Sequence, residues 1–459
     1  MLVFAYDMLR RNDDWTHVEV RPNCQFPSGP TPFDERRYAC GQLMPMCLLD
    51  RQRLRCEQTE ALVRAGHPFV YPLELRFNLR TSLLANPDLA PGIPAAVLEQ
   101  VRQGRAAILV WIGHEHVPLH LGPEGRIWVF DVLLKFLYDH GLPPERVWFV
   151  SGNLFSRLGF QNWLRDRGFT EGGMFRFRTV LMSPTTVRMQ YLANARGEEL
   201  GLTETDDLWT YDLSPLGADD FAGRYVQPAE IAAERRSGKL RPKRFLSMNR
   251  QPWLHRQAIV SHLQGKGFLD DSLVSFRAPP HGMSDLSAFP RFGKSLLESW
   301  QALQPKLPLV IDNAAEKAGL DFHKVAFGWP YRDAYFNIVT ETEIALDVAP
   351  ICTEKLCKPM LNFQPFIAAS TAHTLGYLNG IGFKTFSNII DEGYDTVAEP
   401  VARLTRIFEQ IDRLGVLSPA EARDRYFACL PALEHNRGQL LGGDHQLDRL
   451  FDDIEATLA

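Results

Sequence analysis

The run AAILVWIG at residues 106–113 is followed, after one helical stretch, by the run VWFV at residues 147–150. Both runs are apolar throughout, which is typical of strands that are buried on both faces of a parallel sheet. Between them, apolar residues recur at the spacing of one helical face: Phe130, Leu133, Leu134 and Leu137. Gly141 predicts the end of this helix. The strand–helix–strand order predicts a parallel sheet with helices on both sides.

A second alternation of strands and helices begins near residue 244. We expect strands at residues 245–248, 273–276, 335–340 and 365–369, with helices between them and a capped helix start at Ser418 after Gly415. Between residues 196 and 241 the pattern decays, which predicts a domain boundary there. The predicted fold class is therefore α/β, with two Rossmann-like domains that face a cleft and a helical C-terminal tail. The expected segments are residues 1–235, 243–397 and 398–459.

Composition excludes several classes of protein. The 459 residues are 45% hydrophobic and 23% charged, which argues against a disordered, collagenous or coiled-coil chain. Lys and Arg number 50 and Asp and Glu 55, so the net charge is 50 − 55 = −5, which argues against general nucleic-acid binding. The seven cysteines are odd in number and form no CxxC pair, so we expect reduced thiols. No apolar run approaches the ~18 residues of a membrane span and no signal peptide is evident, so we expect a cytoplasmic protein.

Charged residues gather where the strand at residues 335–340 ends. Glu341 and Glu343 follow that strand, and the next helix begins with Thr353, Glu354 and Lys355. Strand C-termini and helix N-termini share one edge of a parallel sheet, where ligands bind and free N–H groups attract phosphates. Lys355 adds a positive charge, and Glu354 could accept hydrogen bonds from sugar hydroxyls. The alternative is that Thr-Glu-Lys is an ordinary, well-capped helix start.

Two arginines follow the strand at residues 245–248. Arg250 lies in the turn after this strand, and Arg256 lies in the first turns of the helix that comes next. Guanidinium groups at this position suit a diphosphate, because they bind its oxygens through paired hydrogen bonds. The alternative is that both are surface arginines.

These residues resemble the donor-binding half of the fucosyltransferases that transfer fucose to the 3-position, and related glycosyltransferases of the GT-B class. The resemblance covers roughly residues 244–397. The matching features, in order, are Ser247 and Arg256, the aromatic-rich strand that ends at Glu341, the Thr353-Glu354-Lys355 segment, and the buried strand at residues 365–370. The segment FKTFSNIIDEGYD at residues 383–395 resembles a tail of bacterial and viral sugar transferases that share the Thr-Glu-Lys segment. The chain departs from the family at Thr342, where the family has Asn, and in a longer loop before Thr353.

The resemblance implies a nucleotide-sugar donor held by the second domain, without metal or cofactor. Arg256 and Lys355 would contact the diphosphate, and Glu341 and Glu354 would contact sugar and ribose hydroxyls. Arg250 is added to the phosphate contacts because of its position alone. The acceptor, a glycan, protein or small molecule, would then bind the first domain. The resemblance also implies direct attack of an acceptor hydroxyl on the anomeric carbon, with inversion.

The segment HEHVPLH after the strand at residues 106–113 is the candidate source of the general base. Glu115 could remove a proton from the acceptor hydroxyl, and His114 or His116 could do so with a pKa near neutrality. Two alternatives remain: a metal site with His120, which no carboxylate or thiolate at defined spacing supports, and a structural polar loop. Ser151-Gly152-Asn153 ends the neighbouring strand and could line the same site.

The sequence thus predicts a glycosyltransferase that uses a nucleotide-diphosphate sugar. No G-x-x-x-x-G-K-[ST], G-x-S-x-G or dinucleotide fingerprint is present, which disfavours P-loop hydrolases, α/β-hydrolases and simple dehydrogenases. The alternative is a nucleotide- or carbohydrate-binding protein of the same fold that does not catalyse transfer. An enzyme acting on nucleic acid is disfavoured by the net charge.

Overall fold

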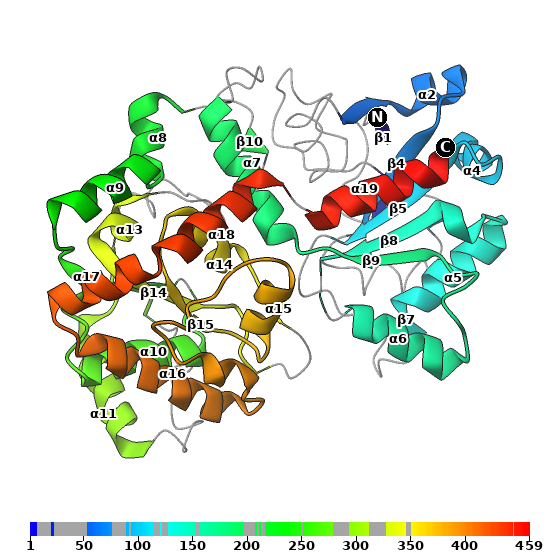
Figure 1. The fold of residues 1–459 in the computed structure, drawn as a ribbon. Helices are drawn as coiled ribbons and strands as arrows, with labels where there is room; N and C mark the ends of the chain where they lie inside the picture. Colours follow the sequence, from blue (N-terminus) through cyan, green and yellow to red (C-terminus); the bar gives the residue numbers. More distant parts are fainter. Residues whose placement is uncertain are drawn as a thin grey trace. The chain divides into compact units, whose positions relative to one another are not determined.

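The protein divides into two compact units, shown in Figure 1. The first unit comprises residues 1–182, 189–215 and 444–459, and the second comprises residues 183–188 and 216–443. The computed structural model describes residues 1–6, 20–22, 53–75, 89–90, 93–112, 120–121, 127–152, 154, 156–196, 207–208, 211–212, 216–249, 251–278, 293–311, 327–345, 350–443 and 445–459.

The described residues of the first unit form a seven-stranded sheet. Six strands run parallel in the order β3 (Leu54–Gln58), β1 (Leu2–Tyr6), β4 (Phe69–Leu75), β5 (Ala106–Ile112), β8 (Val147–Ser151) and β9 (Arg176–Thr179). A short strand, β2 (Val20–Pro22), pairs antiparallel with β4. Two pairs of two-residue strands lie outside this sheet: β6 (His120–Leu121) with β7 (Ile127–Trp128), and β10 (Asp207–Leu208) with β11 (Tyr211–Asp212).

The position of β5 inside the sheet explains why its sequence is apolar throughout. Successive side chains of a strand point to opposite faces of the sheet. Ala106, Ile108, Val110 and Ile112 enter one core cluster, whereas Ala107, Leu109 and Trp111 enter a second cluster. Both faces of the sheet are thus covered, as predicted from the sequence.

Helices cover both faces of this sheet. One cluster takes its apolar residues from α2 (Thr59–Ala65), α4 (Ala95–Arg102), α5 (Val129–His140) and α6 (Ser156–Arg167). Helix α5 ends at Gly141, as predicted, and Gly141 adopts the left-handed conformation at a φ of 59° that glycine tolerates best. The other cluster takes residues from α7 (Met182–Arg196) and α19 (His445–Leu458). A 3₁₀ turn, η2 (Pro144–Arg146), precedes β8.

The second unit contains a smaller sheet whose four described strands are all parallel. Their order is β13 (Ser272–Phe276), β12 (Lys243–Asn249), β14 (Ala334–Thr340) and β15 (Phe366–Ala369). All four lie within a residue or two of their predicted positions. Together with the first sheet they confirm the predicted α/β class with two parallel sheets.

Helices and 3₁₀ turns make up most of the remaining second unit. In chain order they are α8 (Ala218–Arg224), α9 (Pro228–Ser237), α10 (Leu254–Gly265), α11 (Gly293–Leu303), η5 (Gln304–Lys306), α13 (Trp329–Asp333), α14 (Glu354–Leu361), α15 (Thr374–Gly380), η6 (Glu392–Thr396), α16 (Pro400–Gly415), α17 (Pro419–Ala428) and α18 (Leu430–Gly442). The predicted capping box at Ser418 is confirmed, since its hydroxyl accepts a hydrogen bond from the backbone N–H of Glu421 and the Glu421 carboxylate accepts one from Ser418.

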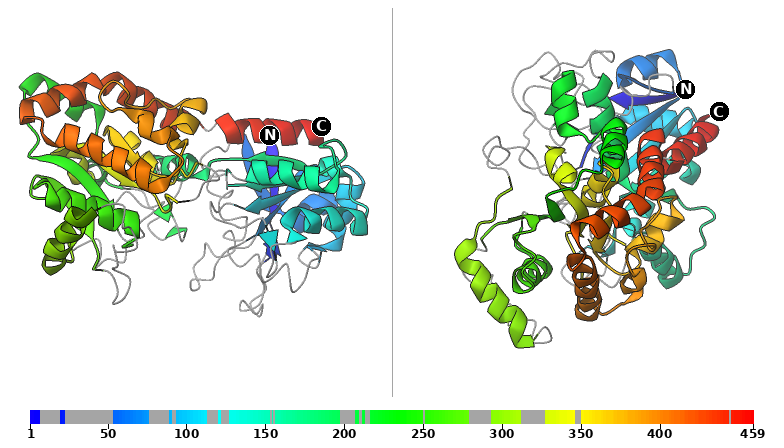
Figure 2. Two further views of the ribbon diagram at one scale, coloured as in Figure 1. Left: turned by 90° about the horizontal axis from the view of Figure 1, so that it is seen from below. Right: turned by 60° about the vertical axis from the view of Figure 1, so that its left-hand side comes forward.

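The division of the chain differs from the expected segments at both ends of the second unit. Residues 216–235 and 398–443 belong to it rather than to an N-terminal domain and a tail. The last helix, α19, lies along the sheet of the first unit, as Figure 2 shows. Its apolar residues Leu447, Leu450, Phe451 and Ile454 pack in the same cluster as β1 and β5. No helix in the described residues is both long and apolar enough to cross a membrane.

Candidate functional site

The sheet of the second unit reverses its direction of growth between β12 and β14. The chain passes from β12 to β13 on one side, then returns to place β14 and β15 on the other side of β12. At such a reversal the connecting segments diverge, and ligands of open α/β sheets bind outside the carboxyl ends of the strands there. We call the carboxyl ends of these two strands, at Asn249 and Thr340, the switch point.

A chain of buried hydrogen bonds joins the two strands at the switch point. The Thr340 hydroxyl donates to Asn249 Oδ1 (2.6 Å), and Asn249 Nδ2 donates to Ser247 Oγ (3.0 Å). The Ser247 hydroxyl in turn donates to the carbonyl of Ile338 (3.3 Å). These three polar side chains are almost fully buried. Because buried polar groups are costly unless paired, this network fixes the edge on which the charged residues lie.

Glu341 follows β14 directly, and its carboxylate is completely buried. Its two oxygens accept hydrogen bonds from Thr353, one from the backbone N–H (2.8 Å) and one from the hydroxyl (2.6 Å). Thr353 is the N-cap of α14, and its hydroxyl also accepts from the N–H of Lys355 (3.3 Å). The end of β14 is therefore tied to the start of α14.

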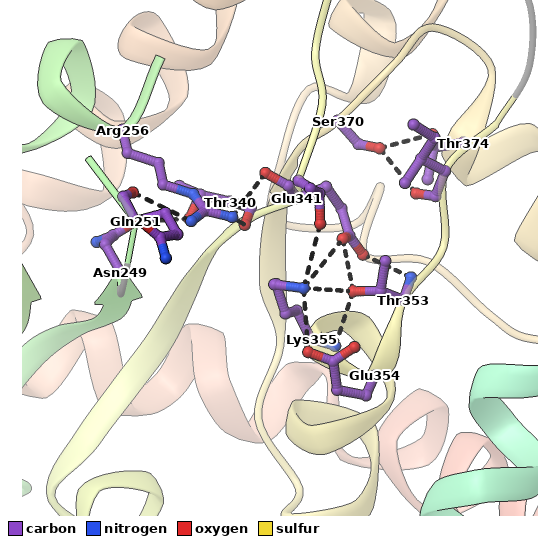
Figure 3. A network of polar contacts seen from close by, with 12 residues as sticks. Asn249, Gln251, Arg256, Thr340, Glu341, Thr353, Glu354, Lys355, Ser370 and Thr374 are labelled. Atoms are coloured by element: carbon purple, nitrogen blue, oxygen red, sulfur yellow. Dashed lines mark hydrogen bonds and ion pairs between the residues drawn. The ribbon is translucent and has the colours of Figure 1, made fainter. Parts of the chain in front are cut away.

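Lys355 lies in the first turn of α14, with its ammonium group among oxygen atoms (Figure 3). Its Nζ lies 2.9 Å from Thr353 Oγ1, 3.0 Å from Glu354 Oε1 and 3.9 Å from Glu341 Oε2. Its side chain is 23% exposed, against 7% for Glu354 and 0% for Glu341. Among these three groups, the ammonium is therefore the one that solvent reaches most easily.

Two neighbouring residues of α10 bind the backbone at the end of β14. The Arg256 guanidinium donates to the carbonyls of Gln251 (3.2 Å), Thr340 (3.2 Å) and Glu341 (3.0 Å). His255 Nε2 lies 2.9 Å from the same Glu341 carbonyl, and because a carbonyl only accepts, this nitrogen carries the proton. The Arg256 Nε is buried and has no hydrogen-bond partner among the described residues.

Burial dominates the electrostatics of these groups. It lowers the pKa of Arg256 to about 10, partly offset by Glu341 and Glu354, so that Arg256 stays positively charged at neutral pH. It raises the pKa of Glu341, against the attraction of Lys355 and the hydrogen bonds from Thr353. Burial, with the neighbouring Arg256, lowers the pKa of His255 to about 3, so that His255 is neutral. Among the described residues, Arg256 therefore joins Lys355 as a positive group at the switch point.

The depressed pKa of His255 predicts a pH dependence of stability. In the unfolded chain this histidine binds a proton below about pH 6.5, but in the fold it does so only below about pH 3. Between these values the unfolded state holds more protons, so stability falls as the pH falls. From pH 7 to pH 5 the loss should be about 2 kcal/mol. Urea unfolding of wild type and His255→Gln at both values measures it, because other titrating groups contribute equally to both proteins. Equal losses in both proteins would contradict the prediction.

The structure brings together four of the seven residues predicted for the site: Arg256, Glu341, Glu354 and Lys355 lie at or beside the switch point. Their environments differ from the expected ones in two cases. Arg256 is 3% exposed and binds backbone carbonyls, and Glu341 is fully buried against Thr353. Arg250, Glu115 and His114 lie outside the described residues, as do His116 and Asn153, and the side chain of His120 is likewise outside them.

Three residues of this region were missed in the sequence. His255 precedes Arg256 in the first turn of α10. The signal in the sequence was that this turn contains a second polar residue beside Arg256. Thr353 was treated only as a cap, although its hydroxyl touches both Glu341 and Lys355. Trp253, the N-cap of α10, is 44% exposed and is the most exposed of the described tryptophans. No periodicity in the sequence distinguishes an exposed tryptophan from a buried one.

Comparison with known proteins gives a distant structural similarity. No family model matches the sequence, and no curated protein matches it. Solved structures of trehalose-6-phosphate synthases resemble the fold over most of the chain. The structure from Burkholderia multivorans is 13% identical, with a TM-score of 0.38, over 93% of this chain and 78% of its own. The E. coli structure, described as bound with UDP-2-fluoro glucose, is 13% identical, with a TM-score of 0.36, over 90% and 76%.

Proposed function

We propose that the protein is a glycosyltransferase that takes a sugar from a nucleoside-diphosphate sugar and passes it to an acceptor hydroxyl. The observation that carries the proposal is the pair of positive groups, Arg256 and Lys355, at the switch point of a parallel sheet. A departing diphosphate develops negative charge there, and fixed cations in a partly buried site stabilise that charge without reorganising. The resemblance of residues 244–397 to fucosyltransferases supports the same class of donor.

Within this proposal, the residues have distinct roles. Lys355 contacts the diphosphate, because its ammonium is the more exposed of the two cations. Glu354, beside it, accepts a hydrogen bond from a sugar or ribose hydroxyl. Arg250 adds a phosphate contact from the turn after β12. Glu115, with His114 as the alternative, removes the acceptor proton from the carboxyl-end side of β5. Inversion at the anomeric carbon follows from the family resemblance.

A second function is favoured by one observation. Two of the groups assigned to the donor, Arg256 and Glu341, are buried and already bonded within the protein. A protein that binds a nucleotide sugar without transferring it would tolerate such an arrangement. Incubation of the protein with nucleotide sugars that bind, followed by measurement of nucleoside-diphosphate release, separates the two functions, because only the enzyme hydrolyses the donor slowly in the absence of an acceptor.

The donor proposal predicts that nucleoside diphosphates quench the fluorescence of Trp253. Trp253 is the exposed N-cap of α10, and Arg256 of the same helix binds the Thr340 carbonyl, so we expect a ligand at the switch point to lie near this ring. Titration with UDP, GDP, ADP, CDP and dTDP should show saturable quenching for at least one of them. Trp253→Phe should lose most of the signal while calorimetry still detects binding. Binding by all five without any change at Trp253 would place the nucleotide elsewhere.

A further inference from the structure

The proposed function assigns no donor group to the Glu341 carboxylate, although this carboxylate lies at the switch point. It is fully buried, and each of its oxygens already accepts a hydrogen bond from Thr353, at 2.8 Å and 2.6 Å. A sugar hydroxyl could reach it only if the start of α14 moved away. The geometry therefore favours a role for Glu341 inside the protein.

That role follows from the single proton on the Thr353 hydroxyl. When the Thr353 hydroxyl donates this proton to Glu341 Oε2 (2.6 Å), the lone pairs of its own oxygen point elsewhere. The Lys355 ammonium lies 2.9 Å from the same oxygen and donates to it, as does the Lys355 backbone N–H at 3.3 Å. A relay thus runs from Glu341 through Thr353 to Lys355.

Lysine needs such a relay more than arginine does. Its ammonium is a compact charge on a flexible stem of four carbons, and fixing that stem costs conformational entropy. Thr353 and Glu354 hold the ammonium from two sides, at 2.9 Å and 3.0 Å, and Thr342 lies 3.4 Å away. A ligand that meets an ammonium already in place loses less entropy on binding.

We propose that Glu341 and Thr353 are positioning residues that hold the Lys355 ammonium for a diphosphate, and that Glu341 does not contact the donor. The inference rests on the proposed function, because it takes the diphosphate as the ligand of Lys355. It replaces the hydroxyl-binding role that the family resemblance implies for Glu341.

Substitutions at Thr353 test the relay with a matched pair. Thr353→Ser keeps the hydroxyl, whereas Thr353→Val keeps the shape and removes it. We expect Thr353→Val to weaken nucleoside-diphosphate binding by about 10- to 150-fold, the effect of one lost hydrogen bond to a charged group, and Thr353→Ser to bind like wild type. If Thr353 only caps the helix, Thr353→Val loses stability but, measured on folded protein, keeps its affinity.

Glu341→Gln tests the direction of the hydrogen bonds in the relay. The glutamine amide donates to the Thr353 oxygen, which then turns its own proton toward the Lys355 ammonium. We expect a similar loss of affinity, and the double variant Glu341→Gln/Thr353→Val should bind no more weakly than Thr353→Val alone, because both substitutions break one pathway. Additive losses would show that Glu341 acts independently of Thr353 and would overturn the proposal.

Inorganic pyrophosphate separates positioning from direct contact with the donor. It has the diphosphate charge but no sugar or ribose hydroxyl. If Glu341 positions Lys355, Glu341→Gln weakens pyrophosphate and nucleoside diphosphate alike. If Glu341 binds hydroxyls, only the nucleotide or the nucleotide sugar is affected, and the inference is wrong. Wild-type protein that binds neither ligand would instead refute the proposed function, so the two failures are distinguishable. If Thr353→Val does not fold, the affinities of Glu341→Gln for pyrophosphate and for the nucleoside diphosphate are sufficient to test the proposal.

Discussion

Replacing Lys355 with alanine is expected to weaken the binding of a nucleoside diphosphate by about 30- to 700-fold. The ammonium lies at the switch point, partly buried, with oxygens of Thr353 and Glu354 around it. Removal of one partner from a close, partly desolvated charge pair costs roughly 2–4 kcal/mol of binding free energy. A lysine that merely begins a helix at the surface would contribute nothing to nucleotide affinity.

The variant should remain folded, because Lys355 adds little apolar contact to the core. We expect its free energy of unfolding to change by about 0.5 kcal/mol. Lys239→Ala is the matched control: Lys239 is exposed in the same unit but precedes the amino end of β12, on the opposite edge of the sheet. Calorimetric titration of the three proteins with the nucleotide that binds wild type measures the effect. Equal affinity of Lys355→Ala and Lys239→Ala would leave Thr353-Glu354-Lys355 as an ordinary helix start.

The strands at the centres of both sheets could be predicted because a strand that is buried on both faces is an apolar run in the local sequence. Strands β5 and β14 are buried along their whole length, and each is an unbroken run with few polar residues. The first sheet also contains β3, which lies at its edge and, among the described strands, pairs with β1 alone. Its sequence LRCEQ is not an apolar run, and in the structure Arg55 is exposed whereas Leu54 is buried. An edge strand of this kind is defined by its neighbour more than by its own composition.

The N-terminal boundary of the second unit depends on contacts that are distant in sequence. Helix α9 buries one apolar residue, Ile231, so it has no apolar stripe to read. Its place is fixed instead by Glu234, whose carboxylate pairs with the buried Arg241 at 2.8 Å. The Arg241 guanidinium also packs over the ring of Tyr426 at 4.0 Å. A pattern search finds no apolar stripe here, and the other partners of Arg241, which are the carbonyls of Tyr331 and Ala334 and the ring of Tyr426, come from elements far along the chain.

The candidate site could be located from the sequence, but its internal contacts could not. Strand ends and helix starts placed Glu341 and Lys355 on one edge, and the structure has them there. Sequence spacing alone does not show that the Glu341 carboxylate is fully buried, since this depends on how residues twelve positions apart pack together. The same holds for Arg256, whose carbonyl partners at Thr340 and Glu341 belong to another strand.

Replacing Glu115 with glutamine is expected to slow sugar transfer by about 10²- to 10⁴-fold and to leave nucleotide affinity unchanged. A general base accepts the proton of the attacking hydroxyl in the transition state, and its loss typically has an effect of this size. Glutamine keeps the shape of the side chain but cannot take the proton. Glu115 comes three residues after the end of β5, a fully buried strand inside the parallel sheet of the first unit. The cations proposed to hold the donor, Arg256 and Lys355, belong to the second unit, so the substitution should not affect them.

The rate of nucleoside-diphosphate release from a bound nucleotide sugar is the measurement, because water replaces the acceptor and loses a proton to the same base. Glu145→Gln is the matched control, since Glu145 is exposed and precedes β8 at the opposite edge of the same sheet. A further sign of a carboxylate base is a rate that rises with pH through the pKa of Glu115 in wild type and loses that rise in Glu115→Gln. A Glu115→Gln protein that turns over like Glu145→Gln would remove Glu115 from the mechanism. His114 would then be the base to test, with a rate that rises through the pKa of an imidazole instead.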